Sequence, residues 1–476
     1  MAARIFPYFL VFMATLGVSH HPFFWDTIQL GSKHAHFFYE TNFSSLLLPE
    51  EMDSGHLPAF GMYIAAAWKI FGKSLPVSHF AMLPFLLGTV FFLQKIGGRL
   101  AGRRWGLWLV LLCLAGPVLA GQAVLVSPDV ALVCFFLMAL WAIWEQDKLA
   151  WLTIAVIGLG LISMRGMMLG MALYFFYVFT GFRGKDGLKV PARKILPFLP
   201  GGLIALAFLF YHWKMTGWVG YHAGSPWAPG FERVGFSGFL INILILGWRL
   251  LDFGQVFIAF GLVVIFAANW PGLAKWKAQL KALKNDGLLT QLLVLLLFIA
   301  LVIIPPLVFY KGLLGHRYLL PVFLPLTFLF FYALQSLTKY RRALFLAVFL
   351  GLASGNFWVY PKNIAMGWDS TLAHLPWYSL EAEMEQFLRS HGISYAAVGT
   401  AFPNIGPRKN MELNGVEDGF REKNLDENCY VFYSNVMNDF TDEEISQLEN
   451  DWQEVTRMER RGVCVILYKN PKQCEN

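Results

Sequence analysis

One polar loop of this chain, residues 25–56, gathers the side chains that do acid–base chemistry. It holds five acidic residues and three histidines. Asp26 stands at the border of the preceding apolar run, directly after Trp25. A carboxylate in such a place costs free energy unless it is paired or used, and burial raises the pKa of a carboxyl group toward the range of a general base. Asp26 is therefore a candidate catalytic base; the alternative is an interfacial side chain that faces water.

The end of this loop reads DSGHLP, from Asp53 to Pro58. Ser54 or Asp53 can cap the helix expected after Pro58. Together with Glu50, Glu51 and His56, Asp53 also forms an acid and histidine cluster that could hold a divalent metal. We favour capping and substrate contact over a metal, because the spacing is loose for a ligand set. Asp53 is then a second catalytic candidate, and Glu51 and His56 are candidates for substrate binding.

Two charged residues farther along interrupt apolar runs. Asp129 follows Pro128, where an acid stabilises a helix start through the macrodipole. The functional alternative is a third catalytic candidate that faces the same cavity as Asp26. Arg165 separates the runs 149–164 and 167–182, and a lone Arg in such a place usually pairs with an acid or a phosphate.

The composition indicates which kind of secondary structure positions these residues. Of the 476 residues, 57% are hydrophobic and 14% are charged, with a mean hydropathy of +0.51. Soluble domains carry about 25% charged residues. These values exclude a disordered chain, a coiled coil and a simple soluble enzyme, and the apolar runs do not alternate as barrel strands do. We predict a polytopic α-helical membrane protein.

Eleven apolar runs predict about eleven transmembrane helices. Two further apolar stretches, 57–71 and 236–250, are expected to lie as surface helices on the outer face of the membrane. The predicted crossings lie near residues 5–24, 77–98, 105–126, 128–144, 149–164, 167–182, 195–213, 252–270, 288–309, 318–337 and 343–359.

Basic residues fall in alternate connections, which indicates the orientation, since Lys and Arg accumulate on the cytoplasmic side. The predicted N-terminus is cytoplasmic, and the C-terminal part is outside. This distribution also explains the basic pI of 9.0 without a nucleic-acid partner. The basic residues are Arg4, Lys95, Arg99, Arg103, Arg104, those of the stretches 183–194 and 275–284, Lys339, Arg341 and Arg342.

Cations on the predicted outer side need a separate explanation. Lys311, His316 and Arg317 lie beside Tyr318 in the sequence YKGLLGHRYLLP. They could bind anionic lipid headgroups or the phosphate of a lipid-linked substrate. His222 lies in the outer loop 214–235, whose aromatic residues either belong to the interfacial belt or stack on sugar rings.

The C-terminal part differs from the rest. Residues 1–360 carry 27 Lys and Arg against 12 Asp and Glu, whereas residues 361–476 carry 11 against 19. We predict a transmembrane domain over 1–360, with a first outer loop at 25–76, and a small extracytoplasmic α/β domain over 361–476. Cys429 and Cys464 lie in two of its predicted strands, so a disulfide between them is one alternative and free thiols are the other.

The order of these features resembles the GT-C integral-membrane glycosyltransferases, in the branch of the protein O-mannosyltransferases and the lipid A aminoarabinose transferases. The resemblance covers the membrane part. It rests on the first helix that ends in Asp26, the loop that ends in DSGHLP, and WKIFG in the surface helix after it. Gln122 to Asp129, the Arg-Gly pair at Arg165 and RYLLP from Arg317 complete the order.

The resemblance implies transfer of a sugar from a polyprenyl-phosphate donor to a lipid, glycan or protein acceptor at the outer membrane face. Asp26 matches the catalytic Asp of the family's first loop. Many members have Asp-Glu there, whereas this chain has Asp26-Thr27, which weakens a metal role. Arg165 and Arg317 fall where contacts to the donor phosphate are expected. The predicted location is a bacterial inner membrane.

Two other classes of protein remain as alternatives. A transporter or lipid flippase predicts ionisable residues at mid-membrane and broken helices, whereas here the charges cluster at the outer helix ends. A non-catalytic membrane scaffold predicts that the acids of loop 25–56 can be neutralised without effect.

Overall fold

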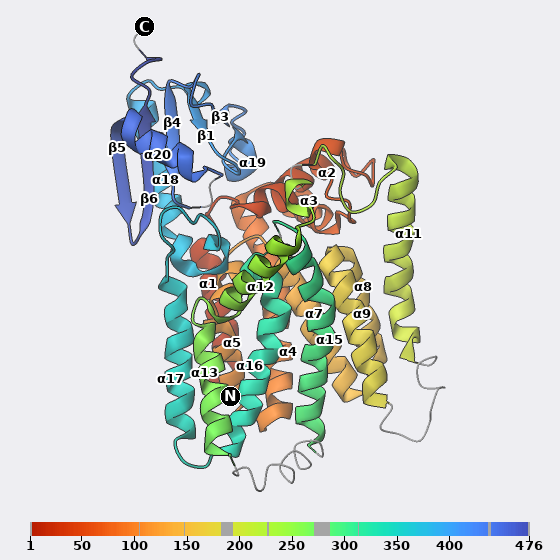
Figure 1. Ribbon diagram of the computed structural model, residues 1–476. Coiled ribbons are helices and arrows are strands. Elements are labelled where there is room, and N and C mark those ends of the chain that lie inside the picture. The colour runs from red at the N-terminus through yellow and green to blue at the C-terminus, as the bar shows by residue number, and fades with distance from the viewer. Residues whose placement is uncertain are drawn as a thin grey trace.

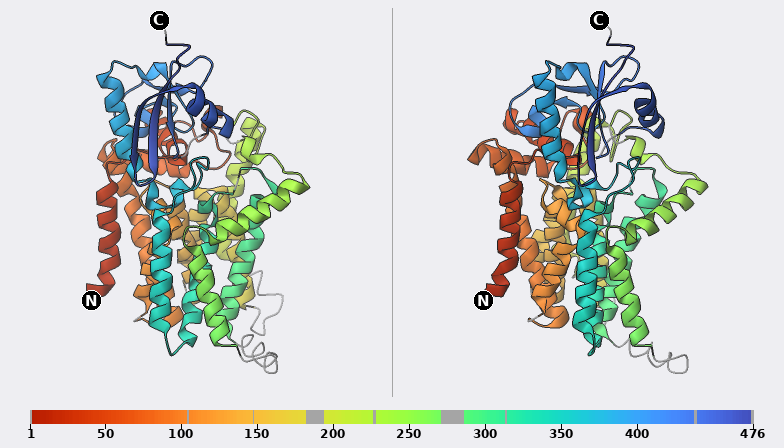
Figure 2. Two further views of the ribbon diagram at one scale, coloured as in Figure 1. Left: turned by 60° about the vertical axis from the view of Figure 1, so that its left-hand side comes forward. Right: turned by 90° about the vertical axis from the view of Figure 1, so that its left-hand side faces the viewer.

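The protein forms a bundle of helices with a small sheet domain at one end (Figure 1). The computed structural model describes residues 2–103, 105–146, 148–181, 194–225, 228–270, 286–312, 314–436 and 439–474. We call the end of the bundle that carries the sheet domain the outer end. The N-terminus lies at the opposite, inner end (Figures 1 and 2).

The predicted apolar runs are helical. Two short helices at the outer end, α2 (His34–Glu40) and α3 (Ala59–Phe71), pack against each other, as expected for a surface location of 57–71. The other helices of the bundle are α1 (Ala2–Val18), α4 (Leu75–Ala101), α5 (Gly106–Ala115), α6 (Pro117–Ala123), α7 (Pro128–Glu145), α8 (Leu149–Ile162), α9 (Met164–Gly181), α11 (Leu199–Thr216), α12 (Phe236–Leu251), α13 (Gln255–Ala268), α15 (Gly287–Phe309), α16 (Leu320–Ala333) and α17 (Arg341–Ser354).

Five helical segments of the described residues are long and apolar enough to cross a membrane. The number rises to seven if each of two bent helix pairs is one span. Other apolar helices, such as α8, are shorter. The structure thus has the helical, apolar character of a membrane protein, but it does not confirm eleven crossings.

The predicted inner-side cations are only partly covered by the described residues. Arg4 and Lys339 lie next to helix ends at the inner end of the bundle, opposite the sheet domain (Figure 1). Arg104 lies outside the described residues, as do the basic residues of 182–193 and 271–285.

Two bends shape the outer end. The chain turns by 80° between α12 and α13, which agrees with the prediction that 236–250 and 252–270 are separate helices. Phe253 and Gly254 make this turn with φ of 46° and 79°. A Cβ atom on Gly254 would lie 2.8 Å from the Gly351 carbonyl oxygen, so the close contact with α17 needs a glycine. A second bend of 78° divides the run 105–126 into α5 and α6, where Pro117 starts the new helix.

The C-terminal domain is built on one six-stranded sheet, as an α/β domain was predicted. The helix α18 (Pro376–Ser390) packs on one face of the sheet, and α20 (Asp442–Asp451) packs at the other with a capping box at Thr441. A short helix, α19 (Lys409–Glu412), lies between β2 and β3. The strand order is β2-β3-β1-β4-β6-β5, with β1 (Val398–Thr400), β2 (Gly406–Pro407), β3 (Gly419–Glu422), β4 (Tyr430–Ser434), β5 (Gln453–Arg460) and β6 (Val463–Lys469).

The structure contradicts a disulfide between Cys429 and Cys464. Cys429 is bonded to Cys474, and Cys464 is a free thiol. The reason is the antiparallel register of β4 and β6, which pairs Tyr430 with Lys469. Cys464 therefore lies at the far end of β6, whereas the residues after β6 return to Cys429.

Replacing Cys474 by Ser should destabilise the C-terminal domain by about 2–4 kcal/mol, because the disulfide closes a long loop in the unfolded chain. Replacing the free Cys464 by Ser is the control and should cost less. Hydrogen exchange of the β4 and β6 amides under non-reducing conditions measures both effects. A linked Cys429–Cys464 peptide in the digest would contradict this assignment.

Candidate functional site

A cavity of about 580 Å³ opens at the outer end of the bundle. Its walls come from the first outer loop, the starts of α7 and α9, the end of α15, the segment after it and loop 217–235. Met366, Phe402 and Asp439 of the C-terminal part line it as well. A cavity between two structural units is a common place for a ligand site.

Asp26 and Arg317 form an ion pair in this cavity. They are 291 residues apart in the chain. The Nε of Arg317 lies 3.5 Å from a carboxylate oxygen of Asp369, and its Nη2 donates to the Tyr318 hydroxyl at 3.1 Å. Arg317 is thus held between the carboxylates of Asp26 and Asp369.

Asp129 and Arg165 form a second pair, with 2.6 Å between Oδ1 and Nη2. The other oxygen of Asp129 and Nη1 of Arg165 have no hydrogen-bond partner among the described residues. Buried polar atoms of this kind are costly unless something satisfies them. Tyr318 connects the two pairs, because its ring centre lies 4.5 Å from the Arg165 guanidinium and 5.0 Å from that of Arg317.

Local structure explains how these charges reach one cavity. The Ser127 hydroxyl accepts a hydrogen bond from the Asp129 amide and thereby caps the start of α7. Ser163 is extended between α8 and α9, so the chain reverses just before Arg165. A Cβ atom on Gly166 would lie 1.9 Å from the Leu159 carbonyl oxygen, so only a glycine permits this tight reversal.

The remaining lining of the cavity is mostly apolar. α9 packs against α8 and α15, and all three helices contribute apolar side chains to it. We call this set the apolar wall: Ile162, Met164, Met168, Ile303, Pro306 and Leu307.

His56 also lines the cavity. Burial lowers its pKa below 6.5, so the imidazole is neutral at pH 7. Nδ1 lies 3.2 Å from the Ser54 carbonyl, which can only accept a hydrogen bond. Nδ1 therefore carries the proton, and Nε2 is left as an acceptor for a hydroxyl group.

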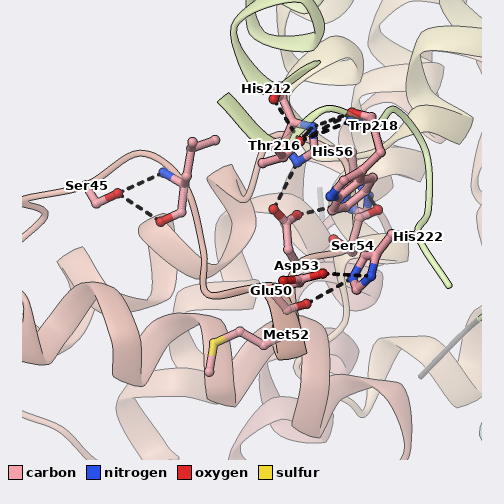
Figure 3. Close-up of polar contacts among 12 residues, drawn as sticks. Ser45, Glu50, Met52, Asp53, Ser54, His56, His212, Thr216, Trp218 and His222 are labelled. Carbon is pink, nitrogen blue, oxygen red and sulfur yellow. Dashed lines mark hydrogen bonds and ion pairs between the residues drawn. The ribbon is translucent and has the colours of Figure 1, made fainter. Parts of the chain in front are cut away.

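The other predicted site residues do not line this cavity. Asp53 is buried and accepts a hydrogen bond from His212 Nε2 at 2.9 Å (Figure 3). His222 pairs with Glu50, and Glu51 is exposed. The two remaining residues pair with acids elsewhere at the outer end: Lys311 with Glu232, and His316 with Asp252 at 2.9 Å.

The acid and histidine cluster at the end of the first outer loop is therefore divided among separate partners. Asp53 turns to His212, whereas His56 faces the cavity. In the part of the chain that the structure describes, no group of three His, Cys, Asp or Glu residues is arranged to hold a metal ion. We therefore assign no ligand set.

Sequence reasoning missed three residues of this region. Asp369 follows the membrane part and contacts Arg317, although nothing in its sequence context sets it apart. His212 lies inside an apolar run, where a histidine is unusual enough to have been a signal. His34 lines the cavity and donates to the Met52 carbonyl at 2.9 Å, and burial lowers its pKa to about 4.

Comparisons with protein-family models, with curated proteins and with solved structures found no match for this chain.

Proposed function

We propose that the protein is a membrane glycosyltransferase that transfers a sugar from a polyprenyl-phosphate donor to an acceptor. The observation that carries the proposal is a single cavity that combines two guanidinium groups, two carboxylates and the apolar wall. The acceptor belongs to the class of hydroxyl-bearing lipids, glycans or proteins.

The parts of the cavity suit the parts of such a donor. Arg165 and Arg317 can hold phosphate oxygens, because guanidinium groups form charge-assisted bonds with phosphate. The Nη1 atom of Arg165, which lacks a partner among the described residues, is the first group that a phosphate would satisfy. The apolar wall offers the prenyl units next to the phosphate an environment as apolar as lipid.

The transfer itself needs a base and a stabilised leaving group. In the proposed step the acceptor oxygen bonds to the anomeric carbon while the bond from that carbon to the phosphate oxygen breaks. Asp26 takes the proton of the acceptor hydroxyl, and the released polyprenyl phosphate keeps the electron pair. Arg165 and Arg317 stabilise the charge that develops on the phosphate. His56 can accept a hydrogen bond from a sugar or acceptor hydroxyl.

The proposal includes the arrangement of the chain in the membrane. We propose a GT-C fold with about eleven crossings, a cytoplasmic N-terminus and a C-terminal domain on the outer side of a bacterial inner membrane. The positions of the chain ends support this orientation, because the N-terminus and the C-terminal domain lie at opposite ends of the bundle (Figures 1 and 2).

Native mass spectrometry of the gently purified protein with added undecaprenyl phosphate tests the donor site. The wild type should retain this lipid in preference to phosphatidylglycerol. Arg165→Ala and Arg317→Ala should each weaken retention by roughly 10–100-fold, the range of one hydrogen bond to a charged group.

Lys311→Ala is the matched control, since Lys311 is an exposed cation at the same end that does not line the cavity. It should retain the lipid like the wild type. An equal preference for phosphatidylglycerol would contradict a polyprenyl-phosphate site and favour a transporter or a scaffold.

A further inference from the structure

Two outer loops meet beside the cavity at a buried pair of side chains. Asp53 belongs to the first outer loop, and His212 lies in the last turns of α11. His212 Nε2 and Asp53 Oδ2 are 2.9 Å apart, and the exposed fractions of the two side chains are 0% and 4% (Figure 3). Removing one partner of such a pair leaves the other buried without compensation.

Each member of the pair also makes a hydrogen bond to the backbone of one of the two loops. Asp53 Oδ1 accepts a hydrogen bond from the Gly55 amide at 2.8 Å, which shapes the turn before His56. His212 Nδ1 lies 3.1 Å from the Trp218 carbonyl, and the two rings meet edge to face (Figure 3). The pair therefore connects the turn at Gly55 with the start of loop 217–235.

The backbones of the two loops touch at the same place. Gly55 has a φ of 72°, and a Cβ atom there would lie 2.4 Å from the Gly220 carbonyl oxygen. A side chain at residue 55 would push loop 217–235 away. The opposite end of that loop is fixed by a bridge between Arg233 and Tyr310.

Both joined segments carry cavity-lining residues. Ser54 and His56 line it from the first loop, and Tyr221 and Phe231 line it from loop 217–235. The rings of Tyr221 and Phe231 are stacked, with centres 4.8 Å apart. Asp53 and His212 themselves do not line the cavity.

We infer that Asp53 and His212 are positioning residues that hold residues 217–225 and 228–235, with Tyr221 and Phe231, over the donor cavity. Asp53 acts through this loop and not on the substrate, in contrast to the catalytic role considered from the sequence. The identity of the ligand in this inference rests on the proposed function, whereas the loop contact does not.

Hydrogen exchange of residues 217–225 and 228–231, combined with undecaprenyl phosphate retention, tests the inference. Asp53→Ala and Gly55→Ala should each raise exchange in this loop and weaken lipid retention, both by at least about tenfold, because buried polar groups lose their partner or the loops are forced apart. Asp53→Asn keeps an oxygen that accepts from the Gly55 amide, and its amide nitrogen can donate to Nε2 of a neutral His212 whose Nδ1 donates to the Trp218 carbonyl, so it should restore most of both properties.

Gly235→Ala is the matched control at the far end of the loop, where an added Cβ atom meets nothing within 4 Å. It should behave like the wild type, and exchange in the core of α7 should stay unchanged in every variant.

Unchanged exchange in Asp53→Ala would overturn the inference, and so would faster exchange with normal lipid retention. If the wild type shows no preference for undecaprenyl phosphate, the proposed function fails. The exchange measurement alone then decides whether the pair holds the loop.

Discussion

Replacing Asp26 by Asn is expected to reduce sugar transfer by about 10²–10⁴-fold, the usual contribution of a general base. The amide cannot take the proton of the acceptor hydroxyl, but its oxygen can still accept the hydrogen bond from Arg317. Folding and undecaprenyl phosphate retention should therefore stay near those of the wild type. The measurement is transfer from a polyprenyl-phosphate sugar in detergent, with lipid retention followed in parallel.

Asp369→Asn is the informative control, because Asp369 contacts Arg317 on a different guanidinium nitrogen. It should weaken lipid retention moderately and leave turnover at saturating donor close to normal. Comparing the two variants therefore distinguishes two causes of reduced activity. Loss of the catalytic base lowers turnover, whereas displacement of Arg317 lowers lipid retention. Full turnover by Asp26→Asn would exclude Asp26 as the base and move attention to Asp129, whose second oxygen has no hydrogen-bond partner among the described residues.

Replacing Arg408 by Met is expected to destabilise the C-terminal domain by about 3–5 kcal/mol. Arg408 is 1% exposed, and its guanidinium forms ion pairs with Glu381, Glu385 and Glu412. Without it, the buried carboxylates repel one another with no compensating charge. Hydrogen exchange of the β4 and β6 amides measures the loss.

The loss of stability in Arg408→Met should depend on pH. Burial raises the pKa of Glu385 from 4.5 to about 7 in the folded protein. A raised carboxyl pKa means that the contribution of this group to stability is present below about pH 4.5 and lost as the pH rises through about 7. Removing Arg408 raises the pKa of Glu385 further. The C-terminal domain of Arg408→Met should therefore be markedly less stable at pH 8 than at pH 6.

Arg457→Met is the control for the loss of an arginine. Arg457 pairs with Glu454 in an exposed position, with 45% of its side chain accessible. Such a pair contributes less than about 1 kcal/mol. Equal effects of Arg408→Met and Arg457→Met would contradict the structural importance of the buried cluster.

The helices and the strands β1, β4 and β6 could be predicted because their signals are local. A run of about 20 apolar residues predicts a helix from its length and composition alone, and the capping box of Thr441 and Glu444 joins residues only three positions apart. β6 alternates between the two faces of its sheet, as Val465 and Ile466 show. β5 was missed because it is an edge strand with mostly exposed, charged residues, which carry no hydrophobic alternation.

The side-chain partners could not be predicted in the same way. Asp26, Asp129, Arg165 and Arg317 were recognised as outer-end charges, but any acid at that end could have paired with any cation. Asp26 contacts Arg317 only because the segments after α1 and before α16 meet at the same cavity. The disulfide partner of Cys429 likewise follows from strand register, which spacing along the chain does not reveal.

The sequence by itself therefore determined the helical, apolar character of the chain, the α/β class of its C-terminal part and the end of the bundle where the charges gather. These properties depend on residue type and short-range periodicity. Only the tertiary structure decided that Asp53 binds His212, that Lys311 and His316 pair away from the cavity, and that Asp369 joins Arg317. Such pairings depend on how distant segments pack, and the geometry of one contact is set by all the others.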